Sequence, residues 1–124
     1  MVHVPLAASS APSVRQRLAR DLVESGVPTT QAEDACLVLA ELVGNAVRHG
    51  APLAGGVLEV DWCVVDGVVE VRVTDGGAGV PRQRTAAVGA ESGRGLAIVD
   101  AVAASWGVAR PAQGGTTVWA RVSR

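Results

Sequence analysis

The sequence predicts an α+β fold in which helices stack on one face of a mostly antiparallel sheet, forming a two-layer sandwich. Three observations lead to this prediction. The first part of the chain has helical periodicity, two alternating apolar segments then follow around a two-residue turn, and a further helix precedes a second hairpin. Covering one face of a sheet lets such helices and hairpins share a core. At 124 residues, the chain fits a single domain over 1–124.

The first segments predict a short strand and a helix. Residues 2–6 can form a strand, and because Pro5 lacks a backbone N–H, that strand belongs at a sheet edge. Ser10 or Ser13 can cap a helix that runs to about Ser25. The apolar face of this helix consists of Val14, Leu18 and Leu22.

A second helix has a clearer start signal. Thr30 and Glu33 have the spacing of a capping box, in which the hydroxyl and the carboxylate each satisfy a backbone amide. The helix should run to about His49 and stop at Gly50, shortly before Pro52.

The middle of the chain predicts a hairpin. Residues 57–65 and 68–74 read as strands, and Asp66-Gly67 between them suits a two-residue turn because glycine accepts a positive φ. Valines alternate with polar residues in the second strand, so one of its faces should be buried and the other solvated. Residues 76–92 show no clear period and predict a loop.

The last part of the chain predicts a helix and another hairpin. The helix should run from about Gly95 to Ser105 and close near Gly107. The final hairpin should turn around residues 111–114, with a last strand at residues 116–122.

Composition excludes several functions. The net charge is −1 and the eleven cationic residues, all arginine, are scattered, so there is no electrostatic case for nucleic acid or an anionic membrane. Without lysine, a P-loop, a eukaryotic-type kinase site and Schiff-base catalysis are all excluded. Cys36 and Cys63 lack the spacing of a zinc site or a disulfide framework. Because no leader-like or membrane-spanning apolar run occurs, we expect a cytoplasmic protein.

Polar residues share one face of the second predicted helix. Glu41 and Asn45 are four positions apart and therefore project from the same side. Arg48 and His49 extend that face by another turn. The face is either the solvated side of the helix or one wall of a site, and the helix alone does not decide between them.

A glycine-rich segment follows the predicted strand at 68–74. In DGGAG, Gly77 and Gly79 allow the backbone to approach a flat ligand, while Asp75 can accept a hydrogen bond from an exocyclic amine. The alternative is an ordinary turn between a strand and a loop.

Two further segments carry weaker signals. SGRGL at 92–96 opens a predicted helix, whose free amides could hold phosphate together with Arg94. GGTTV at 114–118 begins the last strand, where a threonine hydroxyl could reach a base, although threonine is also a good strand residue.

Taken in order, four motifs resemble one family. ELVGNAVRH (41–49), DGGAG (75–79), GRGLA (93–97) and GTTV (115–118) are similar to the N box, G1 box, G2 box and closing strand of the GHKL, or histidine-kinase-like, ATPase superfamily. Their spacing is also similar, and the resemblance covers about residues 11 to 122. GRGLAIVDAVAASWGV followed by GGTTVWA looks especially like the small anti-sigma-factor serine/threonine kinases and their stand-alone actinobacterial relatives. The resemblance implies a Bergerat-type fold that binds ATP with Mg²⁺.

The resemblance also implies a role for each matching residue. Asn45 would bind Mg²⁺ through its amide oxygen, and Glu41 would be the general base. Asp75 would read the adenine amino group, with Thr116 assisting. The other ATP-binding positions would be Arg48, His49, Gly77, Gly79, Gly93, Arg94, Gly95 and Leu96, beneath a lid at residues 80–92. Ala97 departs from the family pattern, which often has a glycine there.

By this resemblance the chain would be a serine/threonine kinase that regulates transcription. Its substrate would be a STAS-type anti-anti-sigma protein and its second partner a sigma factor. The alternative is a module that binds ATP structurally and sequesters its partner without phosphorylating it. Glu41 favours the kinase, because binding alone needs no base. Relatives commonly dimerise, so a homodimer is a further expectation. The chain has no phosphoacceptor-histidine helix, so a complete sensor histidine kinase is not expected.

Overall fold

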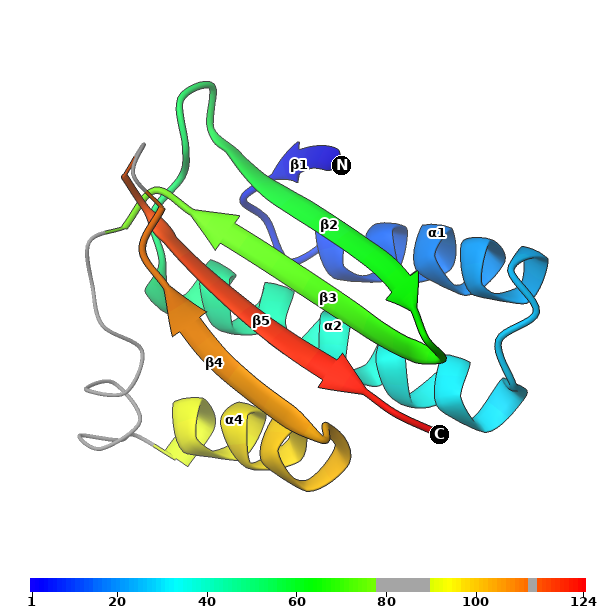
Figure 1. Ribbon diagram of the computed structural model, residues 1–124. Coiled ribbons are helices and arrows are strands. Elements are labelled where there is room, and N and C mark those ends of the chain that lie inside the picture. The colour runs from blue at the N-terminus through cyan, green and yellow to red at the C-terminus, as the bar shows by residue number, and fades with distance from the viewer. Residues whose placement is uncertain (78–89, 112–113) are drawn as a thin grey trace.

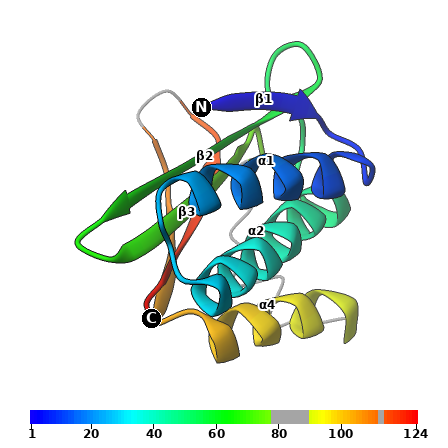
Figure 2. The ribbon, with the colours of Figure 1, turned by 90° about the vertical axis from the view of Figure 1, so that its right-hand side faces the viewer.

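The structure is a computed structural model that describes residues 1–77, 90–111 and 114–124, with only the backbone described for 90–95. In this part of the chain, three helices cover one face of a five-stranded antiparallel sheet whose strand order is β1-β2-β3-β5-β4 (Figures 1 and 2). The predicted fold class is confirmed. The elements are β1 (Val2–Pro5), α1 (Ser10–Glu24), α2 (Thr29–His49), β2 (Val57–Val65), β3 (Val68–Asp75), α4 (Ala90–Val102), β4 (Ser105–Ala109) and β5 (Thr116–Val122).

The core lies between the helices and the sheet. Alternation puts every second strand residue on the covered face, and the helices contribute apolar stripes to the same layer. Trp62 and Trp106 pack at the margin of this core. The largest fully buried side chains are Val14, Leu18, Leu22, Val38, Leu39, Val43, Leu58, Val60, Val69, Val71, Val99 and Val122.

The other face of the sheet is not covered by any described helix (Figure 2). It carries charged side chains that form ion pairs. Arg72 bonds Glu70 on its own strand and Asp61 on β2, the latter at 2.7 Å. Arg121 bonds Glu70 at 2.9 Å, and its guanidinium carbon lies 4.8 Å from the centre of the Trp119 ring. These contacts link three neighbouring strands on the solvated face.

The β2–β3 hairpin has the predicted turn. Asp66 and Gly67 have φ of 52° and 76°, so both central residues lie in the left-handed region that a two-residue turn requires. The other strand predictions also hold, including the edge position of β1, which ends at Pro5.

The predicted N-terminal caps of the first two helices are wrong. Ser10 lies inside α1, and its Oγ donates a hydrogen bond of 2.7 Å to the carbonyl of Pro5. Helix α2 begins at Thr29 after Pro28, without a side-chain cap, so the capping box does not form. The buried Gln31 explains this start, because its amide bonds the hairpin and the last strand and thereby fixes the first turn of the helix.

The bounds of the last helix also differ from the prediction. Helix α4 begins at Ala90 and ends at Val102, so 93–95 lie inside it and not at its opening. Gly107 does not close the helix but lies within β4. A Cβ on Gly107 would come within 2.7 Å of the Trp119 ring, so glycine is needed there for close packing on the open face.

Candidate functional site

Three segments meet at the end of the sheet where β3 finishes. They are the end of α2, the turn after β3 and the start of β5. The N–H of Gly76 donates a hydrogen bond of 2.7 Å to the carbonyl of Ala51, which joins the turn to the segment after α2. Asp75 is paired with Thr116 in the register of β3 and β5. Residues distant in sequence thus form one floor at this end of the sheet.

Asp75 is held at the centre of this floor. Its side chain is buried, and its Oδ1 accepts a hydrogen bond of 2.6 Å from the N–H of Gly77. Thr116 is also buried, and its Oγ1 donates at 2.8 Å to the carbonyl of Gly77. Gly77 therefore links the carboxylate to the threonine. This arrangement brings together three residues that the sequence assigned to the adenine side.

Glycines make the close approach of these segments possible. A Cβ on Gly50 would lie 2.7 Å from the Cγ and Oδ2 of Asp75, and a Cβ on Gly76 would overlap the carbonyl of Pro52. Gly115 has φ of +88°, and a Cβ there would overlap the carbonyl of Asp75. The sequence predicts Gly50 as a helix stop but does not predict its role as a wall of the Asp75 site. No local pattern marks this role, because it depends on the approach of Gly50 to a strand end distant in sequence.

Helix α2 supplies the polar face that the sequence predicted. Glu41 is half-buried, and Asn45, one turn later, is only 3% exposed. Arg48 is exposed, and its Nη1 lies 3.2 Å from the point where a Cβ on Gly44 would stand. The guanidinium thus folds back over the preceding turn, and the small residue leaves room for it. His49 is half-buried at the end of the helix.

Among the described residues, two buried atoms of this face have no hydrogen-bond partner: Oδ1 of Asn45 and Nε2 of His49. An unsatisfied buried polar atom destabilises a protein by about 1–3 kcal/mol, so such atoms are rare in native folds. Both orphans lie on the same helix end, beside the floor that holds Asp75. We interpret them as groups that a ligand completes.

The donor set fits a magnesium ion shared with a nucleotide. Mg²⁺ prefers oxygen, keeps several waters and is commonly held by one or two protein groups together with phosphate oxygens. The unpartnered Oδ1 of Asn45 is such an oxygen. Across the described ranges no group of three or more His, Cys, Asp or Glu side chains could hold a metal by itself. An ion here would therefore depend on phosphate and water for its other ligands.

Some predicted site residues are not brought to this floor. Gly79 lies outside the described residues, as does the predicted lid up to residue 89. Gly93, Arg94 and Gly95 belong to α4, whose first turn is formed by residues 90–92, and Leu96 is buried. Their roles toward phosphate remain predictions.

Comparison with known proteins agrees with the fold. The histidine kinase domain of the blue-light activated histidine kinase from Erythrobacter litoralis EL346 has a similar fold, with a TM-score of 0.55 and 20% identity over 96% of this chain and 61% of that chain. The present chain therefore spans about three fifths of that domain. No curated protein matches. No described helix has the length and apolar character needed to cross a membrane. The protein-family model for the histidine kinase-like ATPase domain matches residues 4–122, and the chain belongs to this family.

Proposed function

We propose that this chain is a Mg-ATP-dependent serine/threonine kinase of the anti-sigma-factor type, acting on a STAS-type anti-anti-sigma partner. Membership of the family supports ATP binding in a regulatory role. The observation that carries the proposal is the buried, unpartnered Oδ1 of Asn45, one helical turn after the carboxylate of Glu41. A metal-binding oxygen and a base on one helix face are what phosphoryl transfer to a hydroxyl requires.

Each residue of the site has a stated task in this proposal. Asn45 holds the magnesium ion, which neutralises charge on the phosphates when it is bound. Asp75 accepts a hydrogen bond from the adenine amine through a carboxylate whose orientation Gly77 fixes. Thr116 supports the same wall.

Glu41 accepts the proton of the attacking serine or threonine hydroxyl. Within the described residues its carboxylate has no hydrogen bond or ion pair, so it is available for a substrate proton. Because Glu41 is half-buried, its carboxylate is accessible only to a hydroxyl that a docked partner presents.

Calorimetric titration with ATP, with and without Mg²⁺, tests the binding step. Saturable binding should weaken in Asn45→Ala and in Asp75→Asn. No binding by the folded wild-type protein would contradict the proposal at its first step.

Transfer from radiolabelled ATP to a STAS-domain anti-anti-sigma protein of the same organism tests the catalytic step. Glu41→Gln should abolish transfer while ATP still binds, whereas Glu33→Gln, an exposed glutamate on the same helix, should leave transfer unchanged. ATP binding without transfer by the wild-type protein would instead support a module that sequesters its partner.

A further inference from the structure

The edge of β2 is unpaired over its second half. Strand β1 pairs with residues 57–60, and no strand in the described part of the chain lies on that side of residues 61–65. An unpaired edge exposes backbone donors and acceptors that can template another strand. Among the described strands, none pairs with this edge of β2 after Val60, the residue that lies opposite Val2 of β1.

The register shows which backbone groups face outward. In an antiparallel ladder, alternate residues bond to alternate neighbours. The N–H of Leu6 bonds the carbonyl of Gly56 at 3.1 Å, which directs the even-numbered residues of β2 toward β1. Trp62 and Val64 therefore point their backbone groups at the open edge.

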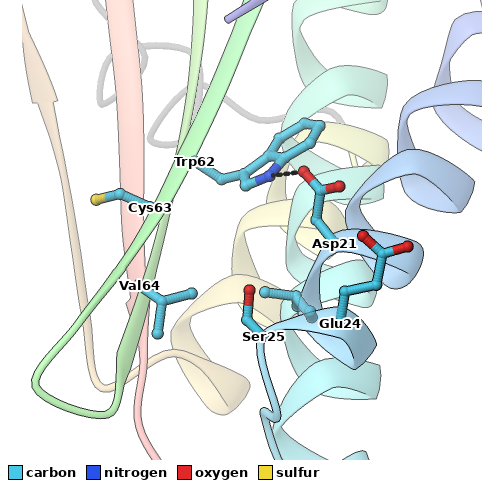
Figure 3. Close-up of a pocket in the computed structure, with 7 residues that line it drawn as sticks. Asp21, Glu24, Ser25, Trp62, Cys63 and Val64 are labelled. Carbon is cyan, nitrogen blue, oxygen red and sulfur yellow. Dashed lines mark hydrogen bonds between the residues drawn. The ribbon is translucent and has the colours of Figure 1, made fainter.

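A groove of about 390 Å³ lies between this edge and the end of α1 (Figure 3). Figure 3 shows Trp62 reaching across toward α1, while Cys63 points to the other side of the sheet. The indole N–H of Trp62 donates a hydrogen bond of 3.0 Å to Oδ2 of Asp21. Leu22, Glu24 and Ser25 contribute the rest of the α1 wall.

The groove is negatively charged. Asp21 and Glu24 are exposed in the last turn of α1, where the helix dipole is negative, and that turn has no basic residue. Arg17 and Arg20 lie one turn earlier, but neither forms an ion pair with them in the described structure. Carboxylates at this end destabilise the helix slightly, so a cation bound there would remove an unfavourable interaction.

We propose that this edge binds an extended segment of a partner protein, which adds to β2 as a strand and places an arginine or lysine against Asp21 and Glu24. The outward backbone groups of Val64 provide the ladder bonds, and the Trp62 ring can stack on the cation. Val64 and Val65 are 39% and 60% exposed, so the added strand would also cover apolar surface. A second copy of this chain fits less well, because pairing two such edges would bring acidic helix ends together.

The proposed docking edge is separate from the nucleotide site. The β2–β3 turn lies at one end of β3 and Asp75 at the other. Partner binding at the edge therefore does not depend on ATP, and its failure would leave the kinase proposal intact.

A set of short acetylated and amidated peptides tests this inference. Each alternates valine and threonine and carries one arginine at a different position, and a matched set carries glutamate instead. Arginine peptides should shift the backbone amide NMR signals of Trp62, Val64 and the end of α1. The double variant Asp21→Asn/Glu24→Gln should bind them at least about tenfold more weakly.

A second pair of variants tests strand addition itself. Proline is tolerated where a strand N–H faces solvent, so Val64→Pro should fold, as circular dichroism can check, yet lose peptide binding. Val64→Thr keeps the N–H and should therefore still bind the arginine peptides. The inference is overturned if no peptide binds the folded wild-type protein, if glutamate peptides bind equally, or if the shifts centre on Asp75. A dimer that Val64→Pro dissolves would also overturn it, in favour of a second copy.

Discussion

Two buried amide side chains at opposite ends of α2 are used in opposite ways. Gln31 and Asn45 are each 3% exposed. The Nε2 of Gln31 donates to the carbonyls of Gly67 and Val122, at 2.7 and 2.9 Å, whereas Oδ1 of Asn45 has no partner in the described part of the chain. The first amide fastens the helix to the hairpin and the last strand. The second keeps an acceptor available where the nucleotide is proposed to bind.

This contrast separates burial for stability from burial for function. Buried polar groups that form hydrogen bonds contribute to a unique fold. A buried polar group without a hydrogen bond destabilises the protein, so it is retained where it has a function such as ligand binding. The two ends of α2 should therefore respond differently to the same kind of substitution, and each response can be measured.

The largest expected effect is on ligand binding at the Asn45 end. Asn45→Ala should weaken binding of Mg-ATP by about 100-fold, because the oxygen proposed to hold the ion is lost. Its free energy of unfolding should change by no more than about 1 kcal/mol, since an unsatisfied acceptor is removed with the side chain. Calorimetry and urea denaturation measure the two quantities. Full-strength ATP binding by this variant would remove the functional half of the comparison.

The Gln31 end should show the reverse pattern. Gln31→Ala leaves two backbone carbonyls without their donor and should lower the free energy of unfolding by about 2–3 kcal/mol. Its affinity for ATP should stay at the wild-type value. Gln16→Ala, at an exposed glutamine of α1, is the matched control and should change stability by less than about 0.5 kcal/mol. Equal stability of the two variants would show that the Gln31 bonds do not fasten the helix.

Gly50 tests whether close packing maintains the floor of the site. Gly50→Ala places a methyl group against Asp75 and should lower the free energy of unfolding by about 1–2 kcal/mol while weakening ATP binding. Gly26→Ala is the control, because Gly26 has φ of +76° but open space around it. That control should lose about 1 kcal/mol through its backbone conformation and keep its ATP affinity. If Gly50→Ala and Gly26→Ala lost a similar amount of affinity for ATP, a local effect at Asp75 would be ruled out.

The smallest effect should come from the open face of the sheet. The hydrogen bond from Arg121, helped by Arg72, holds the pKa of Glu70 below its usual 4.5. Burial raises the pKa of Asp61, but the bond and charge of Arg72 outweigh it and leave that pKa below 3.8. Because both folded-state values are lowered, this contribution is complete above about pH 4.5 and is lost as pH falls further.

Arg72→Leu measures that contribution. It should lower the free energy of unfolding by less than about 1 kcal/mol at neutral pH, because the network is partly solvated. The decline in stability below pH 4.5 should also become shallower than in the wild type. Urea denaturation across this range gives both quantities, and an unchanged pH profile would contradict the role of Arg72.

Local signals in the sequence predicted much of the fold. The Asp66-Gly67 turn, the alternating valines of β3 and the end of α2 at His49 depend on neighbouring residues alone, and the structure has them as expected. The helix starts failed for a different reason. The bonds of Gln31 are tertiary, and they position α2 so that Thr30 is not its cap.

Glycines account for most of the wrong boundaries of the last helix, because a glycine in a sequence predicts the end of a helix even where it serves close packing. The sequence predicts a helix start at Gly95 and a helix stop at Gly107, but the first lies inside α4 and the second packs against the ring of Trp119. The site was anticipated at Asn45, Asp75 and Thr116, and these predictions of role remain to be tested. The wall formed by Gly50 depends on two segments crossing in space, which no local pattern reveals.

The place of β5 within the sheet has a consequence for how the protein is made. Although β5 follows β4 in the chain, it lies between β3 and β4, so the sheet stays divided until residues 116–122 are available. Thr116, at its first position, also completes the floor beside Asp75. A nascent chain stalled before this strand would lack both a continuous sheet and the proposed nucleotide site. The ability to bind ATP should therefore emerge abruptly, once residues 116–122 have been made, together with the folded domain.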